Sequence, residues 1–276
     1  MCATENRPIE IYMFVDPLCS DCWSLEPLLK KLQIEYGQYF RIRYVLSARL
    51  ESLNSFGKRT QDLADKWDKT ASRSGMSCDS DVWLKKPIQS PFLASVAIKA
   101  AELQGKKAGI RFLRRLQEVI FLENRNISEL EVLLSCANEV NIDSDEFLQD
   151  IHSNSASKAF QCDLKITSEM EVSESPTLVF FNENIDEEGL KISGVYNYEV
   201  YVQILEEMLN IAPVKQTPPP LEEFVSYYHL VATTEVAIVY DLSLTDAERE
   251  LKKMLLQQKI RKIPAKYGDF WKSIAY

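Results

Sequence analysis

The sequence predicts an α/β fold in which a long helical insertion separates two groups of strands. Three observations support this class. A strand-helix-strand pattern occupies residues 9–46, a mainly helical stretch follows it, and a second strand pair with a final helix ends near residue 210. A proline-rich segment then leads to a short C-terminal part with a pattern of its own.

The first unit of this pattern carries a Cys-x-x-Cys pair. Residues 9–15 are apolar and β-branched, which predicts a buried strand, and residues 20–36 have the apolar spacing of an amphipathic helix. Cys19 stands at the start of that helix, where free N–H groups and the helix dipole stabilise a thiolate. Cys22 follows three positions later on the same face. A dithiol at a strand-to-helix turn is typical of a thioredoxin-like scaffold.

In other proteins, a Cys-x-x-Cys motif also occurs as one half of a zinc site. Such a site needs a second Cys or His pair at short spacing. The other four cysteines are isolated, and the two histidines, His152 and His229, lie far apart in the sequence. We therefore expect no metal and no cofactor.

The remaining elements follow in order. Residues 40–46 predict a second strand, parallel to the first because a helix connects them. Residues 55–85 are polar and rich in serine, and we expect a loop there with short helical pieces. The helical insertion as a whole is expected at about 55–165, with helices at 91–104, at about 106–122, after a cap at Ser128 and after a cap at Asp143 or Ser144.

Strands at 176–181, with Pro176 as the first residue, and at 189–194 and a helix at 198–209 complete the first domain, residues 1–210. The prolines of residues 211–220 predict an extended linker. Residues 221–276 then read as three helices, the last of them capped by Thr245, and a hairpin. This order predicts a small winged-helix-like domain.

Charge and hydropathy restrict the partners. The net charge of −9 disfavours nucleic acid and anionic membranes. Within the C-terminal part, the basic residues Lys259, Arg261, Lys262 and Lys266 leave a DNA-binding wing as a third hypothesis, although eight basic and eight acidic residues balance there. No apolar run approaches the roughly 20 residues of a membrane span. We expect a cytoplasmic protein with free thiols.

A family resemblance extends this interpretation. Cys19-Ser-Asp-Cys22-Trp, the helical insertion and Ser175-Pro176-Thr177 together resemble the DsbA-like branch of the thioredoxin superfamily. The resemblance implies that Pro176 forms a cis peptide bond and faces the dithiol. It also implies that Ser175, Pro176 and Thr177 border a groove for an extended peptide.

Longer strings carry a closer resemblance over nearly the whole chain. Residues 9–19, 32–36, 187–191 and 268–272 are similar to the SpxH (YjbH) family of ClpXP adaptor proteins. The resemblance implies an adaptor that binds the transcriptional regulator Spx and promotes its degradation by the ClpXP protease, with direct contact to ClpX left open. Some members carry a His- and Cys-rich N-terminal extension, whereas here only Cys2 precedes residue 9.

Two function classes therefore compete. In a thiol–disulfide oxidoreductase, Cys19 attacks, Cys22 resolves and Pro176 holds the substrate. Asp21 places a negative charge beside the pair, which disfavours a thiolate and predicts a weak oxidant. In a binding module, the same groove holds a partner without chemistry. The family resemblance favours the adaptor.

Overall fold

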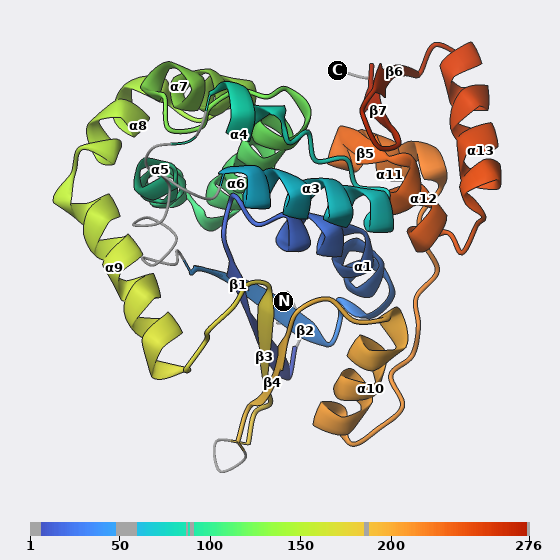
Figure 1. Cartoon of the computed structure of the whole chain (residues 1–276). Coiled ribbons are helices and arrows are strands. Elements are labelled where there is room, and N and C mark those ends of the chain that lie inside the picture. Colours follow the sequence, from blue (N-terminus) through green and yellow to red (C-terminus); the bar gives the residue numbers. More distant parts are fainter. Residues whose placement is uncertain (1–6, 48–59, 87, 89–90, 185–187, 275–276) are drawn as a thin grey trace.

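A four-stranded mixed sheet forms the centre of the larger part of the chain (Figure 1). The computed structural model describes residues 7–47, 60–86, 88, 91–184 and 188–274. β1 and β2 run parallel, as predicted, while β3 is antiparallel to both β1 and β4. The strands lie in the order β2-β1-β3-β4, with the bounds β1 (Ile9–Val15), β2 (Phe40–Leu46), β3 (Thr177–Phe181) and β4 (Leu190–Ser193).

Helices cover the sheet and form the predicted insertion between β2 and β3. Helix α1 (Ser20–Tyr36) follows β1, and α10 (Tyr198–Leu209) follows β4 and packs against α1. α9 runs along the opposite side of the sheet from these two helices (Figure 1). The insertion consists of α3 (Thr60–Ser74), α4 (Asp81–Lys85), α5 (Pro91–Leu103), α6 (Lys106–Leu122), α7 (Leu130–Glu139), α8 (Ser144–Ile151) and α9 (Asn154–Glu169).

Helix α3 corrects one prediction. The sequence predicts a loop with short helical pieces over residues 55–85, and α4 is such a piece, but residues 60–74 form one continuous helix of 15 residues. Residues 55–59 lie outside the described part of the chain. The buried side chains Ala64, Trp67 and Ala71 recur every three or four positions, which is the spacing of one helical face. The many polar residues between them form the exposed face, and they masked this narrow apolar stripe.

Two predicted helix caps are also wrong. α7 begins at Leu130 with Glu129 at the N-cap, and the Ser128 hydroxyl bonds to Asn126 instead. The third C-terminal helix begins at Leu244, where Ser243 rather than Thr245 accepts the N–H of Asp246 at 3.1 Å. In each case several residues able to cap stand within a few positions. The path of the preceding chain decides which of them is extended. The extended Ser243 caps its helix through its side chain, whereas the extended Glu129 makes no side-chain capping bond.

The C-terminal part has a small sheet and its own core. Its order is α11 (Leu221–Tyr228), β5 (Leu230–Ala232), α12 (Thr233–Val239), α13 (Leu244–Leu256), β6 (Ile260–Pro264) and β7 (Asp269–Ser273). β7 lies between β5 and β6, and β5 was not predicted. The fully buried Phe224, Val231 and Trp271 lie in this core. The three helices and the hairpin agree with the predicted order, and the winged-helix-like classification stays a prediction.

The proline-rich segment 211–220 is attached to the end of α1. The N–H of Gln216 donates to the carbonyl of Glu35 at 2.8 Å, and the N–H of Val214 donates to the Tyr39 hydroxyl at 3.0 Å. The segment contains no helix or strand. Among the described residues, no helix is both long and apolar enough to cross a membrane.

Candidate functional site

The two cysteines stand at the beginning of α1, as predicted. Cys19 is the N-cap residue, and its sulfur accepts the backbone N–H of Cys22 at 3.2 Å. Cys19 is partly exposed, whereas Cys22 is buried, with 1% of its surface accessible. Both are free thiols. Burial, reinforced by the hydrogen bond to Cys19, raises the pKa of the Cys22 thiol well above its ordinary value. Cys19 is therefore the member of the pair that an outside molecule can reach.

The loop before β3 faces this dithiol. The Ser175–Pro176 peptide bond is cis, as the resemblance implied. The Cys19 thiol donates to the Ser175 carbonyl at 3.2 Å. The Ser175 hydroxyl in turn lies 2.6 Å from the hydroxyl of Ser47, at the end of β2. Residues next to the ends of β1, β2 and β3, which are far apart in the sequence, thus meet around Cys19.

The buried side chain of Thr177 forms hydrogen bonds that hold this loop in place. Its side chain is buried, and its hydroxyl lies 2.7 Å from both the Glu174 carbonyl and the Ser193 hydroxyl. The N–H of Gly194 also donates to the Pro176 carbonyl at 2.7 Å. The structure therefore brings all five predicted site residues together. Cys19 and Ser175 are partly accessible, while Cys22, Pro176 and Thr177 lie beneath them.

Asp21 does not stand as an isolated charge beside the dithiol. Its carboxylate lies 2.9 Å from the Lys66 ammonium and 3.3 Å from the Arg73 guanidinium, and it accepts a hydrogen bond from Thr70. All three partners come from α3, a region for which the sequence predicts only short helical pieces. Because two cations balance Asp21, the sequence argument for a weak oxidant loses its premise.

In the residues that the structure describes, no group of three His, Cys, Asp or Glu side chains is placed to hold a metal ion.

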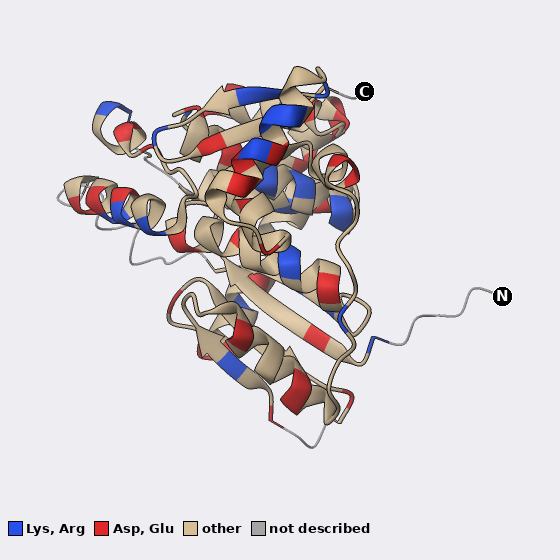
Figure 2. Cartoon of the chain, turned by 90° about the vertical axis from the view of Figure 1, so that its right-hand side faces the viewer, with Lys and Arg blue, Asp and Glu red and all other residues tan. Residues whose placement is uncertain are grey.

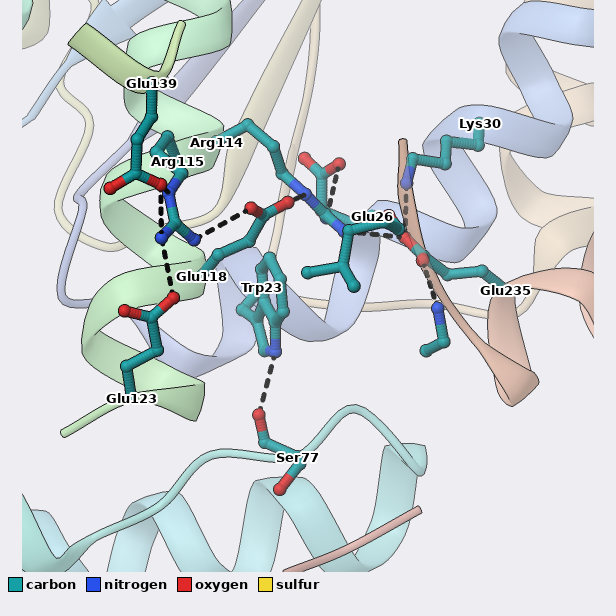
Figure 3. Close-up of polar contacts among 12 residues, drawn as sticks. Trp23, Glu26, Lys30, Ser77, Arg114, Arg115, Glu118, Glu123, Glu139 and Glu235 are labelled. Carbon is teal, nitrogen blue, oxygen red and sulfur yellow. Dashed lines mark hydrogen bonds and ion pairs between the residues drawn. The ribbon is translucent and has the colours of Figure 1, made fainter. Parts of the chain in front are cut away.

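Trp23, which follows the dithiol, connects three parts of the chain. It is fully buried, and its ring stacks against Phe121 of α6, at 5.5 Å, and against Phe270 of β7, at 6.1 Å. The Arg114 guanidinium lies 4.2 Å from the ring centre, and the indole N–H donates to the Ser77 carbonyl at 3.0 Å (Figure 3). The sequence shows Trp23 directly after the dithiol but gives no signal that its side chain connects these distant segments.

A buried charge cluster joins the C-terminal part to the rest (Figure 3). We call Lys30, Arg114, Glu26, Glu118 and Glu235 the docking cluster. Glu235 of α12 is fully buried and lies 2.5 Å from the Lys30 ammonium and 3.4 Å from Arg114. Arg114 also lies 3.3 Å from Glu26 and 3.0 Å from Glu118.

Burial alone would raise the pKa of Glu235, but Lys30 and Arg114 outweigh burial and lower the pKa from its ordinary value. The second Glu235 oxygen accepts the N–H of Ala232 at 2.7 Å. The C-terminal part is therefore fixed by directional, desolvated contacts as well as by apolar packing.

A second group of charges holds the linker. Glu35 of α1 is buried, and its carboxylate lies 2.8 Å from the Lys215 ammonium and 2.6 Å from the Tyr198 hydroxyl. Lys31 of the same helix pairs with Asp241, just after α12. For the docking cluster and for the contacts of Glu35 and Lys31, the only sequence signal was the presence of charged residues within the amphipathic helix at residues 20–36.

The basic residues of the C-terminal part are largely paired. In Figure 2, basic and acidic segments lie side by side over the upper half of the molecule. Three of the four residues of the proposed basic wing form ion pairs: Lys259 with Glu222, Lys262 with Asp269 and Lys266 with Asp68. These pairs weaken the DNA-binding hypothesis, because their charge is already compensated.

The sheet order, the cis-proline loop and the dithiol define a thioredoxin-fold protein of the DsbA type. A family model described as thioredoxin matches residues 12–203. Among solved structures, a putative protein disulfide isomerase from Nitrosomonas europaea aligns with a TM-score of 0.63 at 18% identity, covering 74% of this chain and 98% of its own. The cytosolic disulfide reductase DsbM from Pseudomonas aeruginosa aligns with a TM-score of 0.56 at 16% identity, covering 73% and 97%. These likenesses show the fold.

Sequence comparison identifies the family within this class. The ClpXP adapter protein SpxH of Bacillus subtilis is 52% identical over 272 residues, which is 98% of this chain and 91% of the relative. The ClpXP adapter protein SpxH of Halalkalibacterium halodurans is 51% identical over 274 residues, which is 97% of this chain and 90% of the relative. The chain belongs to the SpxH family of ClpXP adapter proteins.

Proposed function

We propose that this chain is a cytoplasmic adaptor that binds the regulator Spx and promotes its degradation by ClpXP. The observation that carries the proposal is the identity of about half of all residues with SpxH adapters over nearly the full length of both chains. An adaptor of this kind needs no chemistry of its own. It raises the local concentration of the substrate at the protease by holding the two together.

The docked arrangement of the chain supports a binding role. The C-terminal part is held to α1 by the docking cluster and by Trp23, so the surfaces of the two parts are fixed relative to each other. A preorganised surface loses less conformational entropy on binding than a tethered pair of modules does. We further propose that the loop Ser175-Pro176-Thr177 borders the groove that receives an extended segment of a client, and that ClpX contacts the adaptor.

One observation favours a second function, a thiol–disulfide exchange. Cys19 is partly exposed at a helix N-terminus, next to a buried Cys22. The Cys19 thiolate would attack a substrate disulfide, forming a mixed disulfide and releasing one substrate thiol. Cys22 would then lose its proton and displace the second substrate thiol, leaving a Cys19–Cys22 disulfide. The raised pKa of Cys22 slows this second step, because only a thiolate attacks.

The experiment compares both functions in one reaction. Purified ClpX, ClpP, ATP and Spx are mixed with the wild-type chain or with Cys19→Ala/Cys22→Ala, and the loss of Spx is followed by gel. We expect the wild type and the double variant to accelerate degradation equally. Acceleration by neither protein would overturn the adaptor proposal. Acceleration by the wild type alone, together with reduction of a model disulfide peptide, would favour the exchange reaction.

A further inference from the structure

The sheet ends in a strand with an unpaired edge. β2 pairs only with β1 in the four-stranded sheet. The carbonyl of Tyr39 accepts the N–H of Ile9, and the N–H of Ser47 donates to Val15, so the odd-numbered residues of β2 face β1. Because backbone groups alternate along a strand, Phe40, Ile42, Tyr44 and Leu46 direct their N–H and C=O groups outward.

Only one end of this edge is closed. The outward N–H of Leu46 donates to the Asp163 carboxylate of α9 at 2.8 Å. For Phe40, Ile42 and Tyr44, no described residue forms a hydrogen bond to the outward backbone groups. Unpaired N–H and C=O groups along an edge strand are a template for a further strand.

The side chains beside this edge carry positive charge. Arg41 and Arg43 are both exposed, and neither forms an ion pair with a carboxylate in the described part of the chain. Glu10 lies opposite Arg41 in the register of β1 and is the acidic residue on the same face. Arg43 donates to the Tyr12 hydroxyl at 3.0 Å and lies over its ring at 5.0 Å. Arg and Tyr are residue types that are enriched at binding hot spots.

The same face of the sheet is only partly covered. Ile166 and Met170 of α9 pack on a small cluster of Phe14, Val45 and Val179, near the dithiol end of the strands. Toward the other end, Tyr12 is only partly buried and Glu10 is exposed. On the opposite face, Ile42 and Tyr44 pack against the main hydrophobic core and stay partly accessible beside the edge. An added strand would therefore meet cationic side chains on one face and apolar side chains on the other.

We propose that the edge of β2 binds an extended client segment in which acidic and apolar residues alternate, as a fifth strand of the sheet. The acidic positions would lie beside Arg41 and Arg43, and the apolar positions would cover Ile42 and Tyr44. A second copy of this chain does not fit, because pairing two β2 edges would bring like charges together. The inference rests on the proposed adaptor function, since it names a contact that such a client would make.

The first test uses a synthetic probe and does not require Spx. A fluorescent peptide with three Glu-Val repeats between glycines is titrated with the full chain, and anisotropy gives the dissociation constant. A Lys-Val peptide of the same length is the control. We expect binding of the Glu-Val peptide alone, with slower hydrogen exchange at the Ile42 and Tyr44 amides. No binding, or equal binding of both peptides, would overturn the inference.

Two variants then locate the contact. Ile42→Pro removes the central outward N–H but keeps the ladder to β1, because that N–H points away from it. Arg41→Glu/Arg43→Glu reverses the charge. We expect each to weaken peptide binding about tenfold or more. Ile42→Val and the remote pair Lys107→Glu/Arg111→Glu on α6 are the matched controls, and each should bind like the wild type. Circular dichroism confirms that every variant is folded.

The same variants are finally measured with Spx. Weaker Spx binding by Ile42→Pro and by the double Arg variant, but not by the controls, supports the inference. Unchanged Spx binding by folded variants would overturn the edge as a client site while leaving the adaptor function intact. A wild-type chain that does not bind Spx would instead contradict the adaptor function, and the peptide titration would still decide the edge.

Discussion

Replacing Glu235 is expected to loosen the attachment of the C-terminal part. The side chain is fully buried, and Lys30, its closest partner, has 6% of its side chain accessible. Glu235→Ala leaves the Lys30 ammonium buried without this partner, whereas Arg114 keeps Glu26 and Glu118. Breaking a buried pair on one side costs about 3–5 kcal/mol. We expect the lower part of this range, because Arg114 remains compensated.

Unfolding in urea, followed by tryptophan fluorescence, measures this effect, because Trp23 and Trp271 lie at the attachment and in the C-terminal core. A second variant, Lys30→Met/Glu235→Leu, removes both charges and keeps much of the volume. We expect it to recover most of the lost stability, since a buried ion pair replaced by apolar groups is often neutral. A loss below about 1 kcal/mol in Glu235→Ala, or a double variant less stable than the single one, would refute the reasoning.

The same residue predicts a dependence on acid. The pKa of Glu235 is lower in the folded chain than its ordinary value of 4.5. Its stabilising contribution is therefore complete above pH 4.5 and is lost as the pH falls through the folded-state pKa. Urea unfolding of the wild type and Glu235→Gln, measured between neutral and acidic pH, should give curves that converge in acid. A constant difference across this range would contradict the prediction.

Three further predictions concern the region of the dithiol. Trp23→Ala should destabilise the chain by about 3–5 kcal/mol in urea unfolding, because it removes a stacked ring from a closed site; a loss under about 1 kcal/mol would be inconsistent with that packing. Alkylation by iodoacetamide, followed by mass spectrometry, should modify Cys19 well before Cys22, and equal rates would speak against the burial of Cys22. Asp21→Asn should change stability by less than about 1 kcal/mol, since Lys66 is more than half exposed; a larger loss would mean that α3 depends on this ion pair.

Local patterns were sufficient for the framework of the fold. The strand at residues 9–15, the helix at 20–36 and the strand at 40–46 were each predicted with their observed bounds. Periodicity worked there because each element buries a broad apolar face. It failed for α3, where only a narrow stripe around Trp67 is buried, and for β5, which has only three residues.

For the candidate site, too, some features were predictable and others were not. The family resemblance implied the cis bond at Pro176 and its place beside Cys19, and the structure has both. The surroundings of Asp21 could not be predicted, because Lys66 and Arg73, the cations beside its carboxylate, come from a helix about fifty positions away in the sequence. No local pattern reports which distant charge will lie within a few ångströms.

By itself, the sequence determined the strand-helix-strand unit of residues 9–46, the presence of a helical insertion, the position of the dithiol and the family to which the chain belongs. The tertiary structure alone decided that Glu235 lies against Lys30 and Arg114, that Trp23 stacks on Phe270, and that the outer edge of β2 is unpaired. The physical reason is the range of the interactions. Hydrophobic periodicity depends only on the residues of one helix or strand. Ion pairing, ring stacking and strand-edge exposure depend on how separate elements are packed together.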